Sequence, residues 1–285
     1  MESLENMKKT EIKHKIFFGV VVYNKNFEES ETCKKLKEYQ QMNVYIADNS
    51  TIANDLNEKC QECGWNYIQM NGNKGISKAY NKIIENIMQN NSDNTESYII
   101  WIDDDTEITK QYIDKVSEYL ENTEKPADII CPIIINSKNE IISPSIYKKI
   151  KFFKVKKISD VMKIKYKNFI AINTCLVVKM YIYKNYRYDE NLFLDNVDHK
   201  FINDMKRKNK TFKVIEYIVK QNFFSSDNKN YEKEINRKKI EIKDYKYFIK
   251  DEDAFIRFLY FIRVFYWKIK GCIKYKTLKY FRDLS

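Results

Sequence analysis

The N-terminal part of the chain alternates between short apolar segments and segments with helical periodicity. Segments rich in aromatic and β-branched residues, which are typical of buried strands, occupy residues 15–23, 42–50, 65–70 and 98–102. Helix-like segments at residues 26–40, 52–63 and 75–89 separate them. Because crossover helices join parallel strands in this way, the sequence predicts an α/β fold with a largely parallel sheet and helices on both faces.

Polar residues follow several of these predicted strands. Asn24 follows the first strand, Asp48 lies near the end of the second, and Asp103, Asp104 and Asp105 follow the fourth. Open sheets of this type bind ligands at the carboxyl ends of their strands. We therefore expect these side chains to gather at one edge of the sheet.

The three consecutive aspartates, in YIIWIDDDTEI, have two interpretations. In the first, they belong to a solvated loop and one of them caps the next helix. In the second, they bind a divalent cation, because Mg²⁺ and Mn²⁺ prefer oxygen ligands and offset the repulsion between the carboxylates. The triplet alone favours the first interpretation, so the rest of the chain must decide.

The second half of the chain is less regular. Residues 127–135 and 169–179 are strand-like, residues 198–210 are helix-like, and residues 211–219 form a last predicted strand. The lysine-rich residues 147–167 predict a surface insertion or a mobile loop.

The composition narrows the class of protein. A chain of 285 residues with 44% hydrophobic content can bury one large core or two modest ones. Its 51 Lys and Arg against 40 Asp and Glu give a formal charge of +11, which favours an anionic partner such as a nucleotide, a nucleic acid or an acidic membrane surface. Among the six cysteines only Cys60 and Cys63 form a close pair, so we expect reduced thiols and no zinc site.

Localisation signals are few. The first residues lack the apolar core of a signal peptide. The longest apolar stretch, residues 254–267, is too short to span a bilayer and contains Arg257 and Arg263. We therefore expect a cytoplasmic protein without a transmembrane helix.

Several motifs together resemble family 2 glycosyltransferases with the GT-A fold, and in particular the rhamnosyltransferase-like branch that builds bacterial surface polysaccharides such as capsule and O-antigen. In chain order, the motifs are VVVYN, IADNS, NGNKGISKAYN, WIDDDTEI and DENLFLDNVDHKF. The resemblance implies an N-terminal extension (1–14), a GT-A catalytic domain (15–225) and a C-terminal helical region (226–285).

The resemblance also implies a donor site. In the family, the aspartate that matches Asp48 contacts the base. Gly75 precedes a predicted helix in this chain, and we expect the N-terminal amides of that helix to face the diphosphate. Taken alone, each motif is also an ordinary turn. The residues expected to bind the nucleotide sugar are Val22, Tyr23, Asn24, Asp48, Asn73, Gly75, Lys78, Asn81, Asp103 and Asp104.

The aspartate triplet resembles the DxD motif of the same family. Asp103 is expected near the ribose, and Asp105, with Asp103, is expected to hold a Mn²⁺ or Mg²⁺ ion at the diphosphate. The role of Asp104 is left open by the match. Such an ion neutralises charge on the departing nucleoside diphosphate. The resemblance therefore favours the metal interpretation over the helix cap.

Inverting transfer also requires a base that removes a proton from the acceptor hydroxyl. The acidic motif places Asp198 in that role, with Asp195 as the alternative. Asp198 could instead cap the helix that follows, a role compatible with catalysis.

One departure from the family concerns the metal. Members often carry a histidine ligand after the last core strand, where this chain has Gln221 and Asn222, which offer only neutral oxygens. The two histidines, His14 and His199, do not match that position. Weak metal binding and an inactive homologue both remain open at this point.

The C-terminal region carries a second signal. Residues 254–281 are aromatic, and at helical spacing the basic residues fall on one broad side: Arg257, Arg263, Lys268, Lys270 and Lys274. This pattern suits either a helix at an anionic membrane surface or a helix packed on the catalytic domain. A membrane-facing helix would bring the enzyme to a lipid-linked acceptor.

The leading interpretation is a peripheral enzyme at the inner face of the cell membrane that transfers a sugar from a UDP- or dTDP-linked donor to a lipid-linked or growing saccharide. One alternative is a sugar-phosphate nucleotidyltransferase, but residues 21–30 lack the glycine- and arginine-rich loop that binds a nucleoside triphosphate. A second alternative, a nucleic-acid-binding protein, fits the charge and the tyrosine- and lysine-rich tail but leaves the aspartates unexplained. We expect no nucleic-acid partner.

Overall fold

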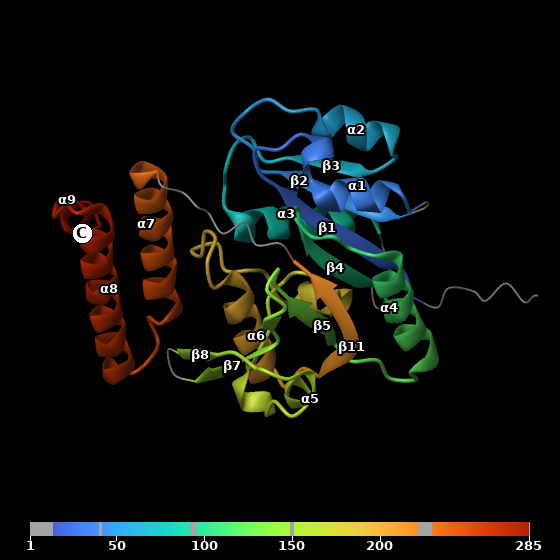
Figure 1. The fold of residues 1–285 in the computed structure, drawn as a ribbon. Coiled ribbons are helices and arrows are strands. Elements are labelled where there is room, and N and C mark those ends of the chain that lie inside the picture. Colours follow the sequence, from blue (N-terminus) through green and yellow to red (C-terminus); the bar gives the residue numbers. More distant parts are fainter. Residues whose placement is uncertain (1–13, 40–41, 92–95, 149–150, 222–229, 285) are drawn as a thin grey trace, which may run out of the picture.

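The computed structural model describes residues 14–39, 42–91, 96–148, 151–221 and 230–284 (Figure 1). A central eight-stranded sheet within these residues has the order β11-β5-β10-β4-β1-β2-β3, with β6 paired to β5. Its strands are β1 (Ile16–Val22), β2 (Asn43–Asp48), β3 (Asn66–Gln69), β4 (Tyr98–Asp103), β5 (Ile129–Ile135), β6 (Ile141–Ser143), β10 (Leu176–Lys179) and β11 (Phe212–Lys220).

The sheet is mostly parallel, as the sequence predicts. β1 pairs in parallel with β2 and β4, and the register sets Val22 opposite Asp48 and Val21 opposite Asp103. The carboxyl ends of three neighbouring strands therefore lie side by side. β10 is antiparallel to both β4 and β5, and β6 is antiparallel to β5, so the second half of the sheet is mixed.

Helices cover both faces of the sheet, which confirms the arrangement expected from the sequence. On one face, α3 (Ile76–Asn90) and α6 (Val197–Arg207) pack with apolar side chains of the strands. On the other face lie α1 (Glu31–Lys37), α2 (Leu56–Glu62) and α4 (Lys110–Asn122). The helix expected at 26–40 is divided into the short 3-10 helix η1 (Phe27–Glu29) and α1, because Ser30 adopts an extended conformation and caps α1 by accepting a hydrogen bond from the Cys33 amide.

The lysine-rich residues 147–167 include regular structure, so the prediction of a mobile loop is wrong for the described part. A small sheet forms from β7 (Ser145–Lys148), β8 (Lys151–Phe153) and β9 (Phe169–Ile170), and a short α5 (Ile158–Val161) follows β8. Val155 and Val161 are buried against Ile133 and Ile141 of the central sheet. The apolar residues between the lysines therefore anchor this segment.

The strand expected at 169–179 is interrupted. β9 and β10 are separated by a turn in which Cys175 has a positive φ of 56°. This turn directs Thr174 toward the aspartate triplet, where its hydroxyl donates a hydrogen bond to Asp103.

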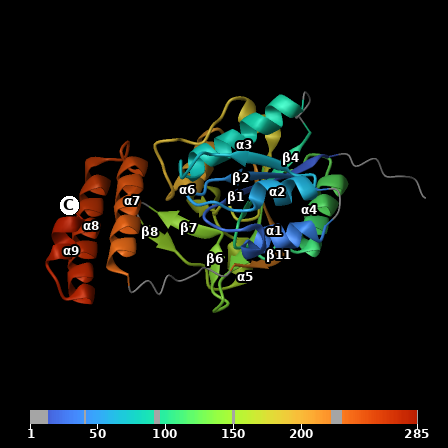
Figure 2. The ribbon, with the colours of Figure 1, turned by 90° about the horizontal axis from the view of Figure 1, so that it is seen from above.

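The C-terminal region folds into three helices, α7 (Tyr231–Phe248), α8 (Ala254–Tyr275) and α9 (Lys279–Asp283). Figures 1 and 2 show them beside the α/β part, with α7 nearer to it and α8 beyond. In the part of the chain that the structure describes, none of the helices combines the length and the apolar character needed to traverse a bilayer.

Candidate active site

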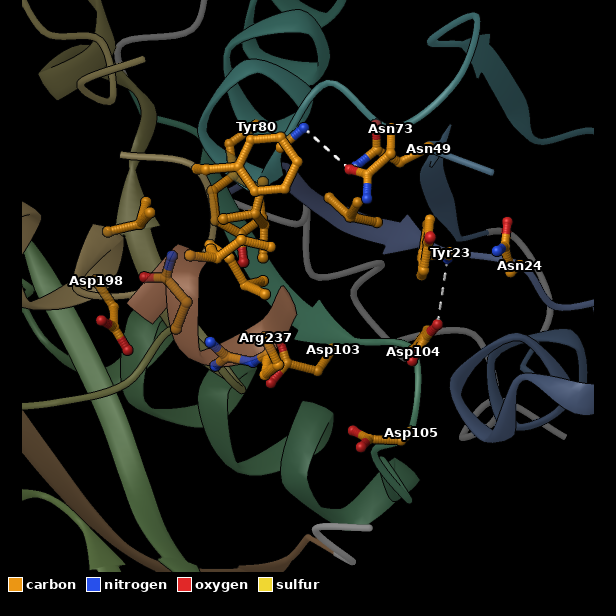
Figure 3. Close-up of a pocket in the computed structure, with 18 of the residues that line it drawn as sticks. Tyr23, Asn24, Asn49, Asn73, Tyr80, Asp103, Asp104, Asp105, Asp198 and Arg237 are labelled. Atoms are coloured by element: carbon orange, nitrogen blue, oxygen red, sulfur yellow. Dashed lines mark hydrogen bonds between the residues drawn. The ribbon is translucent and has the colours of Figure 1, made fainter. Parts of the chain in front are cut away.

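A cavity of about 820 Å³ opens at the carboxyl ends of the parallel strands, with α7 on its other side (Figure 3). The convergence of polar strand ends predicted from the sequence is therefore present. The sequence-predicted residues that line the cavity are Tyr23, Asn24, Asn73, Gly75, Asp103, Asp104, Asp105 and Asp198.

The aspartate triplet does not cap a helix. The next helix, α4, is capped by Thr109, whose hydroxyl oxygen accepts a hydrogen bond from the Tyr112 amide. Burial raises the pKa of Asp103 to about 6, and the nearby charges of Asp105 and Asp104 add to the rise. The first sequence interpretation is therefore wrong, and the triplet instead concentrates unfavourable negative charge in the cavity.

Asp104 has a partner of its own. Lys25 Nζ lies 2.7 Å from Asp104 Oδ1, and the Tyr23 amide donates to Asp104 Oδ2 at 3.5 Å (Figure 3). Burial still raises the pKa of Asp104, while the Lys25 ammonium opposes the rise. Asp104 thus fixes the loop after β1.

Asp103 and Asp105 converge on one side chain. Gln221 Nε2 donates to Asp103 Oδ2 at 2.9 Å and to Asp105 Oδ1 at 3.3 Å. The Oε1 atom of Gln221 is buried and has no hydrogen-bond partner among the described residues. The two carboxylates are oxygen ligands that Mn²⁺ and Mg²⁺ accept, so these residues fit a divalent cation. A half-turn rotation of the Gln221 amide would bring its oxygen toward them.

The site would still need ligands from outside the protein. In the described residues there is no group of three or more His, Cys, Asp or Glu side chains arranged to hold a metal ion. His14 is buried beside the Glu96 carbonyl, and the His199 ring packs at a tilt against Phe152 with ring centroids 4.5 Å apart, so neither supplies the family histidine. Asn222 lies outside the described residues.

A network of asparagines shapes one end of the cavity. Asn49 accepts a hydrogen bond from the Lys74 amide at 2.8 Å, and its Nδ2 donates to Asn73 Oδ1 at 3.0 Å. Asn73 Oδ1 also accepts from the Gly75 amide at 3.2 Å. Asn24, with a φ of 51°, accepts from the Thr51 amide at 2.7 Å. These bonds hold the loops after β1, β2 and β3 against one another.

Five predicted site residues lie outside the lining of this cavity: Val22, Asp48, Lys78, Asn81 and Asp195. Val22 is wholly buried in the core. Asp48 accepts hydrogen bonds from Asn54 and Tyr67, and although its burial favours the neutral form, these and the bonds from Ser50 lower its pKa. Asn81 binds both backbone groups of Tyr188, donating at 2.9 Å and accepting at 2.8 Å. Direct contacts between these residues and a nucleotide-sugar substrate stay predictions.

Asp198 lies in the first turn of α6 and borders the cavity on the side away from the aspartate triplet (Figure 3). The residue before that helix is Asn196, so the interpretation of Asp198 as the cap is wrong. Asp195 is engaged elsewhere, because the Arg237 guanidinium donates two hydrogen bonds to its carboxylate, one of them at 2.7 Å. Of the two candidate bases, Asp198 borders the cavity, whereas the carboxylate of Asp195 is occupied by Arg237.

α7 also holds the loop that leads to Asp198. The carboxylate of Asp244, which is fully buried, accepts hydrogen bonds from the amides of Phe193 at 3.0 Å, Leu194 at 2.7 Å and Asp195 at 2.8 Å. Three consecutive amides bound by one carboxylate fix this loop to the C-terminal helices. The C-terminal region is thereby part of the site.

Comparison with known proteins identifies the family. The model of glycosyl transferase family 2 matches residues 19–187. This chain belongs to that family. No curated protein matches the sequence.

Three solved structures show a distant likeness to this glycosyl transferase, each at 8% sequence identity. Glucosyl-3-phosphoglycerate synthase from Mycobacterium tuberculosis with Mn²⁺, UDP and phosphoglyceric acid has a TM-score of 0.49 over 80% of this chain and 76% of that one. The same enzyme with Mg²⁺ and UDP gives 0.46 over 80% and 77%. CMP:2-keto-3-deoxy-manno-octonic acid synthetase with CTP gives 0.40 over 72% and 90%. These likenesses are too distant to identify a substrate or a metal.

Several residues of the glycosyl transferase cavity escaped the sequence analysis. They are Asn49, Tyr80, Asn173, Phe193, Lys233, Asn236 and Arg237. Asn49 lies inside the IADNS motif, so its polarity was an available signal. Lys233, Asn236 and Arg237 come from α7, whose position over the cavity follows from tertiary packing and has no local sequence signal.

Proposed function

We propose that this family 2 glycosyl transferase moves a sugar, with inversion, from a UDP- or dTDP-linked donor to a saccharide acceptor in bacterial surface polysaccharide synthesis, as its resemblance to the rhamnosyltransferase-like branch implies. The observation that carries the proposal is the meeting of the aspartate triplet and Asp198 in one cavity. Family membership supplies the reaction class, and the cavity supplies both an acidic donor end and a separate carboxylate for the acceptor.

Asp103 and Asp105 would hold the divalent cation, Mn²⁺ or Mg²⁺. When bound, such an ion would neutralise charge on the leaving nucleoside diphosphate. Asp104 is paired with Lys25, whose Nζ lies 2.7 Å from Asp104 Oδ1, while the other two carboxylates accept hydrogen bonds from Gln221. Burial and the neighbouring carboxylates raise the pKa of Asp103, and the concentrated negative charge of the three aspartates would favour a cation.

Asp198 is the proposed base. The acceptor oxygen forms a bond to the anomeric carbon, its proton passes to the Asp198 carboxylate, and the bond from the anomeric carbon to the diphosphate breaks with the electron pair leaving on the diphosphate. The bidentate pairing of Asp195 with Arg237 favours Asp198 over Asp195 for this role. The same pairing keeps the guanidinium of Arg237 on the cavity wall.

The outer face of α8 is the proposed membrane contact. Its buried residues, Ile256, Tyr260 and Gly271, face the rest of the protein. On the opposite side the exposed residues are apolar: Phe255, Phe258, Phe261, Ile262, Phe265, Tyr266, Ile269 and Ile273. The basic residues flank this face, and the net charge of +11 complements an anionic surface. Such a contact places the enzyme peripherally at the inner face of the membrane, near a lipid-linked or growing saccharide.

Calorimetric titration tests the donor site. Full-length protein is titrated with UDP, dTDP, GDP and CMP, with and without Mn²⁺, and the series is repeated on Asp105→Ala. The matched control is Asp114→Ala on α4, whose side chain is 59% exposed and pairs with Lys110 outside the cavity. We expect one nucleotide to bind only with Mn²⁺, to wild type and control alike, and not to Asp105→Ala. Binding that ignores both the metal and Asp105 would contradict the proposed site.

A further inference from the structure

A second cavity, of about 780 Å³, adjoins the first and shares Asn73 and Phe193 with it. Its walls come from the loop before α3, the segment around Glu190, and the helices α7 and α8. Six cationic side chains line it: Lys74, Lys78, Lys243, Lys246, Lys250 and Arg257. Glu190 is the one carboxylate among its described lining residues. The two neighbouring cavities therefore have opposite charge.

The cations of the second cavity lack ion-pair partners among the residues that the structure describes. Lysines elsewhere on the helices pair with glutamates, as in Lys59 with Glu62 at 2.9 Å and Lys115 with Glu118 at 2.8 Å. By contrast, across the described residues no ion pair involves any of the six cations of the cavity. Glu190 accepts a hydrogen bond from Asn81 at 3.1 Å instead. Like charges held together in this way favour an anionic ligand.

The wall between the cavities is fixed. Asp244 binds the amides of Phe193, Leu194 and Asp195, which attaches this wall to α7. Asn191 Nδ2 donates to the Tyr247 hydroxyl at 2.9 Å and makes a second connection to α7. The arrangement is therefore already formed, so binding an anion would require little reorganisation of the backbone.

We propose that the second cavity binds a phosphate or diphosphate group carried by the acceptor. This inference rests on the proposed function, because it takes the first cavity as the place of the donor diphosphate and of Asp198. An acceptor whose hydroxyl reaches Asp198 extends past Phe193, so a phosphate on the same molecule can enter the basic cavity. Lysines act as point charges for phosphate groups, and several of them together match a doubly or triply charged ligand.

The phosphate group could be borne by a lipid or by a soluble sugar. Arg257 belongs to α8, the helix whose outer face is apolar, so the basic cavity and the proposed membrane contact are continuous on one element. Both sources present the same chemistry to the cavity, and the experiment separates them.

The probe is inorganic pyrophosphate, titrated calorimetrically into full-length protein without divalent metal. The test variant is Lys243→Glu with Lys246→Glu. The control, Lys208→Glu with Lys239→Glu, changes the net charge equally at exposed lysines that line neither cavity. We expect saturable binding to wild type that weakens by about tenfold or more in the test variant and by less than about twofold in the control. Equal weakening in both variants, or no saturable binding to wild type, would overturn the proposal.

A second variant keeps the test valid if Lys243→Glu with Lys246→Glu fails to fold. Lys250→Gln with Arg257→Gln removes two cations from other positions of the cavity and is expected to weaken pyrophosphate binding in the same direction. Unchanged affinity in a folded second variant would count against the cavity as the binding site.

The donor site is measured separately. Mn²⁺-dependent nucleotide binding by Lys243→Glu with Lys246→Glu is expected to stay within about twofold of wild type, because the donor diphosphate lies at the other cavity. If nucleotide binding fails in wild type while pyrophosphate binding depends on Lys243 and Lys246, the proposed function fails and the anion site stands. If only the pyrophosphate result fails, the proposed function stands without this inference.

Vesicles identify the source of the phosphate. Phosphatidylcholine vesicles carry either an isoprenyl diphosphate or an equal charge of phosphatidylglycerol. Stronger binding to the isoprenyl diphosphate, lost in the test variant, supports a lipid-borne acceptor. Pyrophosphate binding with no such preference among vesicles supports a soluble sugar phosphate. Equal, variant-sensitive binding to both charged vesicles would overturn the acceptor assignment in favour of general lipid head groups.

Discussion

The side-chain amide of Gln221 joins Asp103 and Asp105. Its Nε2 atom lies 2.9 Å from Asp103 Oδ2 and 3.3 Å from Asp105 Oδ1. The backbone amide of Gln221 donates to the Ile135 carbonyl at 3.0 Å, which fixes the residue beside β5. Gln221 therefore stands beside both proposed metal ligands, where the resembled family often has a histidine.

Substitution of Gln221 tests whether it contributes to metal binding. Gln221→Ala is expected to weaken Mn²⁺-dependent nucleotide binding by about tenfold, because groups that support a metal site typically contribute tenfold to a hundredfold in affinity. Gln221→His is expected to strengthen it, since imidazole is a better ligand than an amide oxygen. Titration of Mn²⁺ at fixed nucleotide concentration measures both. Identical affinities in the three proteins would show that Gln221 takes no part.

Asp198 and Asp195 are distinguished by their effects on the rate. Asp198→Asn is expected to lower kcat by about a thousandfold while nucleotide affinity stays unchanged, because general bases contribute roughly a hundredfold to ten-thousandfold. Asp195→Asn is expected to lose far less, since its carboxylate is paired with Arg237. Initial rates of sugar transfer, compared with calorimetric nucleotide affinities, separate the two. A larger loss of kcat in Asp195→Asn would reverse the assignment.

The sequence predicted best those features that depend on residues close together in the chain. The ends of β1, β2 and β4 could be predicted because apolar strands end abruptly at Asn24, Asp48 and the aspartate triplet, and parallel pairing then brings them together. The antiparallel direction of β10 was not anticipated, because it depends on the path of the chain between β4 and β10.

The site contribution of α7 was beyond sequence reasoning for a different reason. Arg237 and Asp244 are ordinary charged residues of a lysine-rich helix, and the helix is only weakly amphipathic. Their importance arises from contacts with the loop around Phe193, about fifty residues earlier in the chain. Such long-range contacts leave no periodic signal in either segment.

Gly75 is a position where both space and backbone conformation exclude a side chain. Its φ is 88° and its ψ is 159°, a region that only glycine adopts readily. A Cβ atom at Gly75 would also lie 2.8 Å from Phe193, which lines both cavities. We expect Gly75→Ala to lower the free energy of unfolding by about 3–4 kcal/mol, combining backbone strain with overpacking, and to weaken nucleotide binding.

Gly72 provides the control for Gly75. Its φ is 95°, but a Cβ atom there would meet nothing within 4 Å. Gly72→Ala should therefore cost only the backbone strain, about 1–2 kcal/mol. Urea unfolding of both variants measures the difference. Equal destabilisation would show that the contact with Phe193 is relieved without cost.

Asp128 is expected to give a measurable dependence of stability on pH. Burial would raise its pKa, but hydrogen bonds from Thr211 and from the Tyr181 hydroxyl, at 2.6 Å, outweigh burial and lower the pKa. Because the folded pKa lies below the unfolded value, the carboxylate stabilises the fold above the unfolded pKa, and this contribution is lost as the pH falls through the folded pKa. Asp128→Asn should therefore lower the free energy of unfolding by about 1–2 kcal/mol at pH 7.

The difference between wild type and Asp128→Asn should shrink as the pH falls below about 4. Urea unfolding at a series of pH values measures it, with Asp160→Asn as a control whose side chain is 50% exposed and pairs with Lys163. A difference that stays constant down to low pH would mean that the lost hydrogen-bond geometry, and not the charge, accounts for the effect.

The apolar face of α8 predicts membrane binding that depends on a few exposed aromatic residues. Phe258 and Phe261 are 57% and 66% exposed, so replacing them removes little packing from the folded protein. Each phenylalanine buried in a bilayer interface contributes roughly 1.5–3 kcal/mol, so Phe258→Ser with Phe261→Ser should weaken sedimentation with anionic vesicles by well over tenfold.

The control is Ile158→Ser with Met162→Ser, both 43% exposed and far from α8 in sequence. Nucleotide binding should be unchanged in both variants, and the remaining vesicle binding should fall with added salt. Vesicle binding that is equal in wild type and in the α8 variant would mean that this face meets something other than a membrane.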